Sequence, residues 1–137
     1  MDAKICKRGE VLVKNKCIKG IQWGFDITGF DSAAKFKALL KRNDLKSYKR
    51  EHHVYDIGDY HSEWYHYIWE SPKLRLVTGN NPITGIYTIP KGRTPQKGFA
   101  SYIGIQGDKD AVKQLVKDIK KTTLDIKAES PRERGYI

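Results

Sequence analysis

Two segments of the chain repeat the order strand, helix, strand, and this order limits the folds available to it. Residues 20–57 begin with IQWGFDIT, in which apolar residues alternate with polar or small ones as in a half-buried strand. The helix that follows is expected to start at Asp31 or Ser32, because either side chain can accept a hydrogen bond from the first turn. Residues 98–128 repeat the order with the strand FASYIGIQG and a helix capped by Asp108. The apolar stripe of this second helix consists of Val112, Leu115, Val116 and Ile119.

Antiparallel β structure is expected before and between these two units. The N-terminal sequence ICKRGEVLVKNKCIKG is typical of a small β meander, and a hairpin is predicted to turn at residues 58–59. We therefore predict an α+β fold with one mixed, mostly antiparallel sheet and two helices on one face. The expected topology is a ferredoxin-like βαβ…βαβ arrangement with a central β-hairpin insertion and an N-terminal β meander. Residues 1–128 are expected to form a single domain, and the polar residues 129–137 a mobile tail.

The net charge of +10 is unevenly distributed along the 137 residues. Lys and Arg outnumber Asp and Glu by 13 to 5 in residues 1–50 and by 11 to 6 in residues 91–137, but residues 51–90 have 2 against 5. A basic chain attracts polyanions, of which nucleic acid is the first candidate and an anionic membrane surface the second. The alternative is a contribution to solubility alone. Because no apolar run reaches the roughly 18–20 residues of a transmembrane segment and no signal-peptide pattern is present, we expect a soluble, intracellular protein.

Two basic segments are the candidate phosphate contacts. One is the first predicted helix and the other is the glycine-rich loop PKGRTPQKG, where backbone can approach an anion closely. This loop matches neither the P-loop pattern nor G-x-G-x-x-G, and a solvated helix face and ordinary turn chemistry are the alternatives. The candidate nucleic-acid-binding residues are Lys35, Lys37, Lys41, Arg42, Lys91, Arg93 and Lys97.

The acidic middle segment contains all four histidines of the chain. Imidazole and carboxylate groups ligate Zn²⁺ or Mn²⁺ and exchange protons near neutral pH, so a metal-dependent nuclease is one hypothesis. On regular strands, His61 and His66 face opposite sides, whereas Asp56 can share a face with His52. No spacing such as H-E-x-x-H occurs, and surface histidines with ordinary partners are the alternative; no metal or cofactor is predicted. The candidate catalytic residues are His52, Asp56, His61, Glu63 and His66.

The segment SEWYHYIWES places aromatic residues on both faces of one predicted strand. Such side chains can stack on unpaired bases, but the flanking residues are acidic and the RNA-binding signature K/R-G-F/Y-G/A-F-V-x-F/Y is absent. Core packing or a subunit interface is therefore favoured, and a homodimer would cover both faces. The candidate interface residues are Trp64, Tyr65, Tyr67 and Trp69.

The two cysteines, Cys6 and Cys17, have ten residues between them and form no CxxC pattern. A meander would place them on its first and third strands, too far apart for a direct bond. We therefore expect two buried free thiols, with a disulfide of the kind found in hyperthermophile proteins as the alternative.

From MDAKICKRGEVLVKNKCIKG to ESPRERGYI, the chain resembles the small basic orphan proteins of viruses that infect hyperthermophilic archaea. The resemblance is one of length and of a basic composition poor in Asn, Gln, Cys and Met, which is typical of thermophilic proteins. It implies a host-cell or virion setting, favours nucleic-acid binding and assigns no functional residue. We therefore expect a non-enzymatic nucleic-acid-binding protein that acts through phosphate contacts. A metal-dependent nuclease and a protein-interaction module or virion component are the alternatives.

Overall fold

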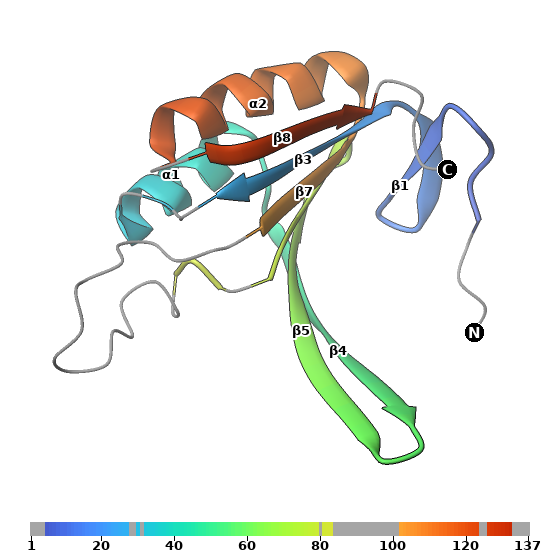
Figure 1. Ribbon diagram of the computed structural model, residues 1–137. Helices are drawn as coiled ribbons and strands as arrows, with labels where there is room; N and C mark the ends of the chain where they lie inside the picture. Colours follow the sequence, from blue (N-terminus) through green and yellow to red (C-terminus); the bar gives the residue numbers. More distant parts are fainter. Residues whose placement is uncertain are drawn as a thin grey trace, which may run out of the picture.

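The described part of the chain folds into eight strands and two helices (Figure 1). The computed structural model describes residues 5–27, 30, 32–79, 81–83, 102–123 and 126–132. The elements are β1 (Glu10–Val13), β2 (Lys16–Lys19), β3 (Ile21–Ile27), α1 (Ala33–Arg42), β4 (Ser47–Ile57), β5 (Tyr60–Glu70), β6 (Leu74–Thr78), β7 (Tyr102–Gly107), α2 (Lys109–Thr122) and β8 (Ile126–Arg132).

Six of the strands form one sheet with the order β4-β5-β6-β7-β3-β8. Each pairing between neighbours in this sheet is antiparallel, so the predicted α+β class is confirmed, but the described sheet is antiparallel and not mixed. Strands β7 and β8, which α2 connects, lie on either side of β3. The ferredoxin-like topology stays a prediction.

Both helices cover the same face of this sheet (Figure 1). The alternation in β3 directs Ile21, Phe25 and Ile27 to that face, where they are buried. The apolar sides of the helices complete the core, as the spacing of their apolar residues predicts. The helical residues in the core are Phe36, Leu39 and Leu40 of α1 and Val112, Leu115, Val116 and Ile119 of α2.

Both helices start at side-chain caps. The Ser32 hydroxyl accepts a hydrogen bond from the Lys35 backbone N–H at 3.0 Å, and an Asp108 carboxylate oxygen accepts one from the Ala111 N–H at 3.1 Å. Ser32 therefore caps α1, while Asp31, the other predicted cap, lies outside the described residues. Neither described helix combines the length and the apolar composition that crossing a membrane requires.

Strands β4 and β5 form a long hairpin that projects from the sheet (Figure 1). Its pairing extends from Ser47 opposite Glu70 to Ile57 opposite Tyr60, and the turn lies at the predicted residues 58–59. Only the last four residues of β5 pair with β6, so the remainder of β5 has, within the described part of the chain, no strand beside it other than β4. We call residues 51–66 the arm.

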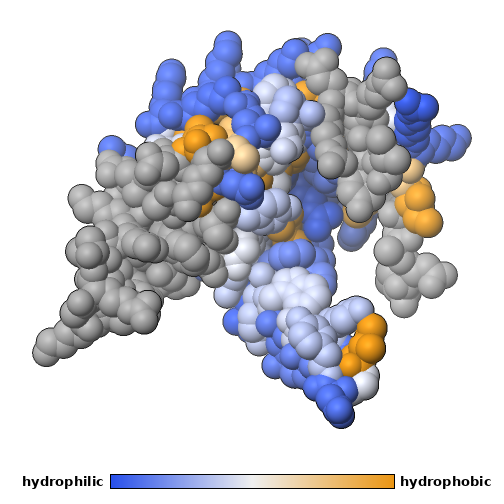
Figure 2. Space-filling view, viewed as in Figure 1, coloured by the Kyte–Doolittle hydropathy of each residue, from blue (hydrophilic) through white to orange (hydrophobic). Residues whose placement is uncertain are grey.

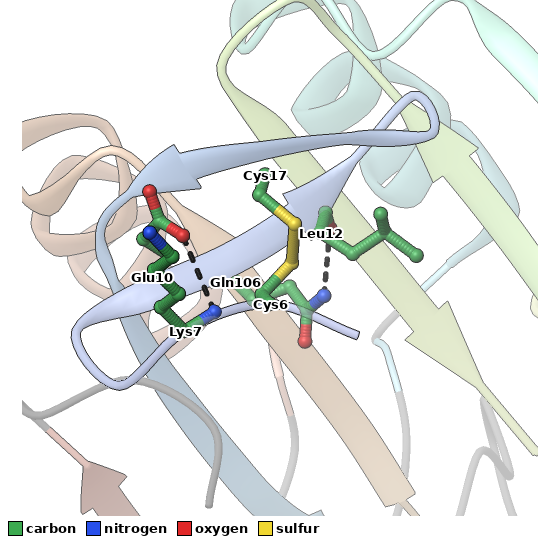
Figure 3. The surroundings of a disulfide bond; sticks show 6 residues. All are labelled: Cys6, Lys7, Glu10, Leu12, Cys17 and Gln106. Carbon is green, nitrogen blue, oxygen red and sulfur yellow. Dashed lines mark hydrogen bonds between the residues drawn. A yellow bond between two sulfur atoms is a disulfide. The ribbon is translucent and has the colours of Figure 1, made fainter. Parts of the chain in front are cut away.

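The N-terminal hairpin β1–β2 packs on the sheet face opposite the helices. Val11 and Val13 are buried there, and the Gln106 side chain donates a hydrogen bond to the Leu12 carbonyl at 2.7 Å (Figure 3). The predicted meander is thus a hairpin of two strands, with residues 5–7 outside any strand.

Cys6 and Cys17 form a disulfide, so the prediction of two free thiols is wrong (Figure 3). The turn at residues 8–9, where Gly9 has a φ of +87°, folds the segment that contains Cys6 back over the hairpin. The two Cα atoms lie 5.5 Å apart, which is the usual separation for a disulfide.

The predicted domain boundary at residue 128 falls inside a strand. Strand β8 continues to Arg132 and pairs with β3, and the Trp23 indole N–H donates to the Glu129 carboxylate at 2.7 Å. This pairing gives hydrogen-bond partners within the sheet to backbone N–H and C=O groups that a mobile tail would expose to water. Residues 133–137 lie outside the described part.

Candidate functional site

The outer surfaces of the two helices are basic. Helix α1 has three Lys and one Arg with no acidic residue, and α2 has five Lys against two Asp. Of the predicted nucleic-acid-binding residues, Lys35, Lys37 and Lys41 are exposed together on α1. Figure 2 shows hydrophilic side chains gathered over the helical layer.

Arg42 differs from these lysines because its charge is paired within the fold. Its guanidinium donates to both carboxylate oxygens of Asp118 in α2, at 2.6 and 3.0 Å. The Asn43 amide donates to the same carboxylate at 2.9 Å. The hydrogen bond between Arg42 and Asp118 raises the pKa of the Arg42 guanidinium. Arg42 therefore joins the two helices, and because its side chain is still 50% exposed, its role as a phosphate contact stays a prediction.

Lys91, Arg93 and Lys97, the other predicted phosphate contacts, lie outside the described residues. The same is true of the glycine-rich loop that contains them.

One face of the arm carries four of the five predicted catalytic residues. The His52 and His61 imidazoles lie 3.5 and 3.6 Å from the same Glu63 carboxylate oxygen, and His61 also contacts Asp56. All four side chains are exposed, with between 45% and 64% of their surface accessible. The His52 ring stacks on Tyr65 with centroids 4.7 Å apart.

The opposite face of the arm carries the fifth residue, His66. Its cross-strand partner is Glu51, and its ring centroid is 4.4 Å from that of His53. The five predicted catalytic residues therefore do not converge on one point. Successive side chains of a strand point to opposite faces, and His66 is on the face opposite the other four. Sequence reasoning did separate the faces of His61 and His66, but it did not include Glu51 or His53 among the candidates.

Burial has the largest effect on the pKa of His66 and lowers it below the ordinary value of 6.5. The nearby charges of His53 and Arg75 lower it further, and Glu51 opposes them. The folded state therefore favours the neutral form of the His66 imidazole.

The predicted aromatic interface is divided between the core and the surface. Trp69 is buried against Phe36 and Tyr48, with ring centroids 5.1 Å apart in each pair, and Tyr67 packs against the edge of the core. Trp64 and Tyr65 lie on opposite faces of the arm and are 41% and 37% exposed. Two of the four residues therefore stabilise the fold, and two are accessible to a partner.

A groove of about 380 Å³ lies on the sheet face opposite the helices. Gly24 and Gly104 are cross-strand partners in its floor and add no side chain of their own to it, whereas the Tyr102 side chain lies beside Gly104. A Cβ added at Gly104 would lie only 2.6 Å from the Tyr102 hydroxyl oxygen. Sequence reasoning missed this groove, although glycines in the middle of two predicted strands could have indicated it.

No protein-family model matches the chain, and no curated protein or solved structure is significantly similar to it. The resemblance to proteins of archaeal viruses stays a prediction.

Proposed function

We propose that the protein is a non-enzymatic nucleic-acid-binding protein whose phosphate contacts come from α1 and α2. The observation that supports this proposal is the set of exposed lysines on the outer surface of the helical layer. Lys37, Lys41 and Lys117 make no ion pair with any described residue. Unpaired surface cations release condensed counterions when they meet phosphates, and this release drives sequence-independent binding.

The distribution of charge gives the proposed complex an orientation. The arm has four acidic residues and no Lys or Arg, and it projects away from the helices (Figure 1). A polyanion is attracted to the helical layer and repelled by the arm. The exposed aromatic residues of the arm are therefore poorly placed for stacking on bases, and phosphate contact by the helices is the favoured mode.

The test is fluorescence anisotropy with labelled single-stranded DNA, duplex DNA and RNA over a series of salt concentrations. The triple variant Lys37→Glu/Lys41→Glu/Lys117→Glu is expected to bind more weakly than the wild type to each nucleic acid. The slope of log Kobs against log salt should become shallower by about 1 for each lysine that contacts a phosphate.

The matched control is the triple variant Lys7→Glu/Lys16→Glu/Lys19→Glu. It makes the same change in net charge on exposed lysines of the N-terminal segment, outside the helical layer. The control should retain most of the affinity. An equal loss in both triple variants would contradict the helical layer as the binding surface. Wild-type affinity that is absent, or that does not change with salt, would contradict nucleic-acid binding through phosphate contacts.

A second proposal is that the arm binds a second copy of the chain. Apolar and aromatic side chains near its tip are unusually accessible, and an exposed group of this kind is typical of protein interfaces. These residues are Val54 (49% exposed), Tyr55 (47%), Ile57 (59%) and Tyr60 (61%). Figure 2 shows the apolar surface at the tip of the projecting hairpin.

Sedimentation velocity tests this second proposal. The wild type is expected to form a dimer as its concentration rises, and Ile57→Asp/Tyr60→Asp should remain monomeric. A wild type that stays monomeric at every concentration would exclude the dimer.

A further inference from the structure

Three potential metal ligands meet on the face of the arm that carries His66. Glu51 and His66 are direct cross-strand partners, and His53 lies two residues along β4 on the same face. One ligand atom from each of the three side chains lies within 4.8 Å of the others. The His53 Nε2 atom is 3.5 Å from a Glu51 carboxylate oxygen. All three side chains are half-buried.

Unsatisfied polar atoms gather at the same place. The His53 Nε2 atom and the Arg75 Nε atom are both inaccessible to water and have no hydrogen-bond partner among the described residues. Buried nitrogen atoms of this kind are rare in folded proteins, and a bound ion is one of their ordinary explanations. His53 is also held in place, because its ring stacks on Trp64 with centroids 5.5 Å apart and planes 10° apart.

We infer that Glu51, His53 and His66 form a binding site for a divalent transition metal ion of the zinc class. Two imidazole nitrogens and one carboxylate oxygen are a donor set that Zn²⁺ takes in sites with three protein ligands, and the fourth position then holds water. Because Zn²⁺ binds nitrogen and oxygen ligands at about 2.0–2.2 Å, the three ligand atoms, now within 4.8 Å of one another, would have to close around the ion. The inference does not depend on nucleic-acid binding by the helices.

Two cations compete with a metal ion for the carboxylate. Arg75 Nη2 lies 4.0 Å and Lys49 Nζ 3.9 Å from Glu51 oxygens. Removing the charge of Arg75 should therefore strengthen metal binding, because the carboxylate loses a competing partner and the ion loses a repulsive neighbour. A nonspecific loss of structure would not have this effect.

The experiment is calorimetric titration of Zn²⁺ alone into the full chain at pH 7. One ion should bind per chain, and His53→Ala and His66→Ala should each raise the Kd at least about tenfold, since even outer-shell changes have effects of this size. Arg75→Gln should lower the Kd. The matched control is His52→Ala, which removes an imidazole from the other face of the same strand and should leave the Kd unchanged.

A measurement on the wild type avoids any dependence on the folding of variants. Addition of Zn²⁺ should shift the NMR resonances of the imidazole rings of His53 and His66 and leave those of His52 and His61 in place. Shifts confined to His52 and His61, the absence of saturable binding, or equal weakening by His52→Ala and His66→Ala would each overturn the assignment.

Discussion

At the scale of single residues, Asp118 is the group that connects the two helices by hydrogen bonds. Its side chain is only 12% exposed, and it accepts from both Arg42 and Asn43. Burial by itself would raise the pKa of Asp118, but these hydrogen bonds and the charges of Arg42 and Lys121 outweigh it and lower the pKa below 3.8. The folded state therefore favours the charged form of the Asp118 carboxylate.

Replacing this carboxylate should destabilise the protein. Asp118→Asn keeps the shape of the side chain but removes the charge that Arg42 pairs with, so we expect the free energy of unfolding to fall by about 1–3 kcal/mol. Urea unfolding at pH 7 measures the change. Asp110→Asn, at an exposed acidic residue of the same helix, is the control and should have little effect. Equal effects of the two substitutions would contradict the role of Asp118.

Stability should also depend on pH through Asp118. Because the folded pKa is lowered, the contribution of this group is complete above the ordinary value of 3.8 and is lost as the pH falls through the lower folded value. The difference in unfolding free energy between the wild type and Asp118→Asn should therefore shrink as the pH is lowered. Urea titrations at several pH values test this, and a difference that grows in acid would contradict it.

Gly107 is a second residue whose replacement has a defined consequence. Its φ is +153°, and a Cβ at this position would lie 2.0 Å from the Lys73 carbonyl oxygen. Gly107→Ala should lower the free energy of unfolding by more than about 2 kcal/mol, since it adds a clash to an unfavourable backbone conformation. Gly58→Ala is the matched control: Gly58 also has a positive φ, of +56°, but open space around it. Thermal unfolding of the two variants should show the larger loss at Gly107.

At the scale of elements, the N-terminal hairpin depends on contacts that its own sequence does not supply. Val11 and Val13 are buried against the sheet, and the Lys14 backbone N–H donates to Glu70, 56 residues away, at 2.7 Å. The Cys6–Cys17 disulfide closes a short loop at the start of this hairpin (Figure 3). The hairpin therefore covers one end of the sheet face that the helices leave open.

Reduction of the disulfide should destabilise the folded state. The cross-link restricts the unfolded chain over a sequence separation of 11 residues, for which a stabilisation of about 2–3 kcal/mol is expected. Denaturant unfolding with and without a thiol reductant measures the effect. The double variant Cys6→Ser/Cys17→Ser should resemble the reduced wild type and show no response to reductant; a wild type that is equally insensitive would contradict the disulfide.

At the scale of the whole molecule, charge is separated between a basic helical layer and an acidic arm. The described sheet connects the two, and the arm extends away from α1 and α2 (Figures 1 and 2). In the proposed complex both regions would act on the polyanion through long-range forces, so we expect the arm to influence binding without touching the nucleic acid.

Neutralising the arm should therefore increase nucleic-acid affinity at low salt. Asp56→Asn/Glu63→Gln removes two negative charges from its exposed face, and the gain should disappear as the salt concentration rises, because the Debye length falls from about 30 Å at 0.01 M to about 8 Å at 0.15 M. Anisotropy at several salt concentrations measures it. A gain that persists at high salt would indicate direct contact between the arm and the nucleic acid instead.

The sequence by itself determined the local features of this protein. The α+β class, the caps at Ser32 and Asp108, the turn at residues 58–59 and the opposite orientation of His61 and His66 all follow from short-range rules. Helix caps, strand alternation and turn chemistry involve residues only a few positions apart, so they can be predicted from one segment at a time.

The tertiary structure decided which side chains make contacts within the fold and which remain accessible at the surface. Arg42 and Asp118 are 76 residues apart, and their pairing depends on the packing of α1 against α2. The proximity of Glu51 and His53 to His66 required the exact register of β4 and β5, and the groove required Gly24 to lie opposite Gly104. The disulfide likewise depended on how residues 5–7 fold back over the hairpin. Such contacts join segments whose relative position is set by the order and register of strands across the whole sheet, and no local pattern specifies that order.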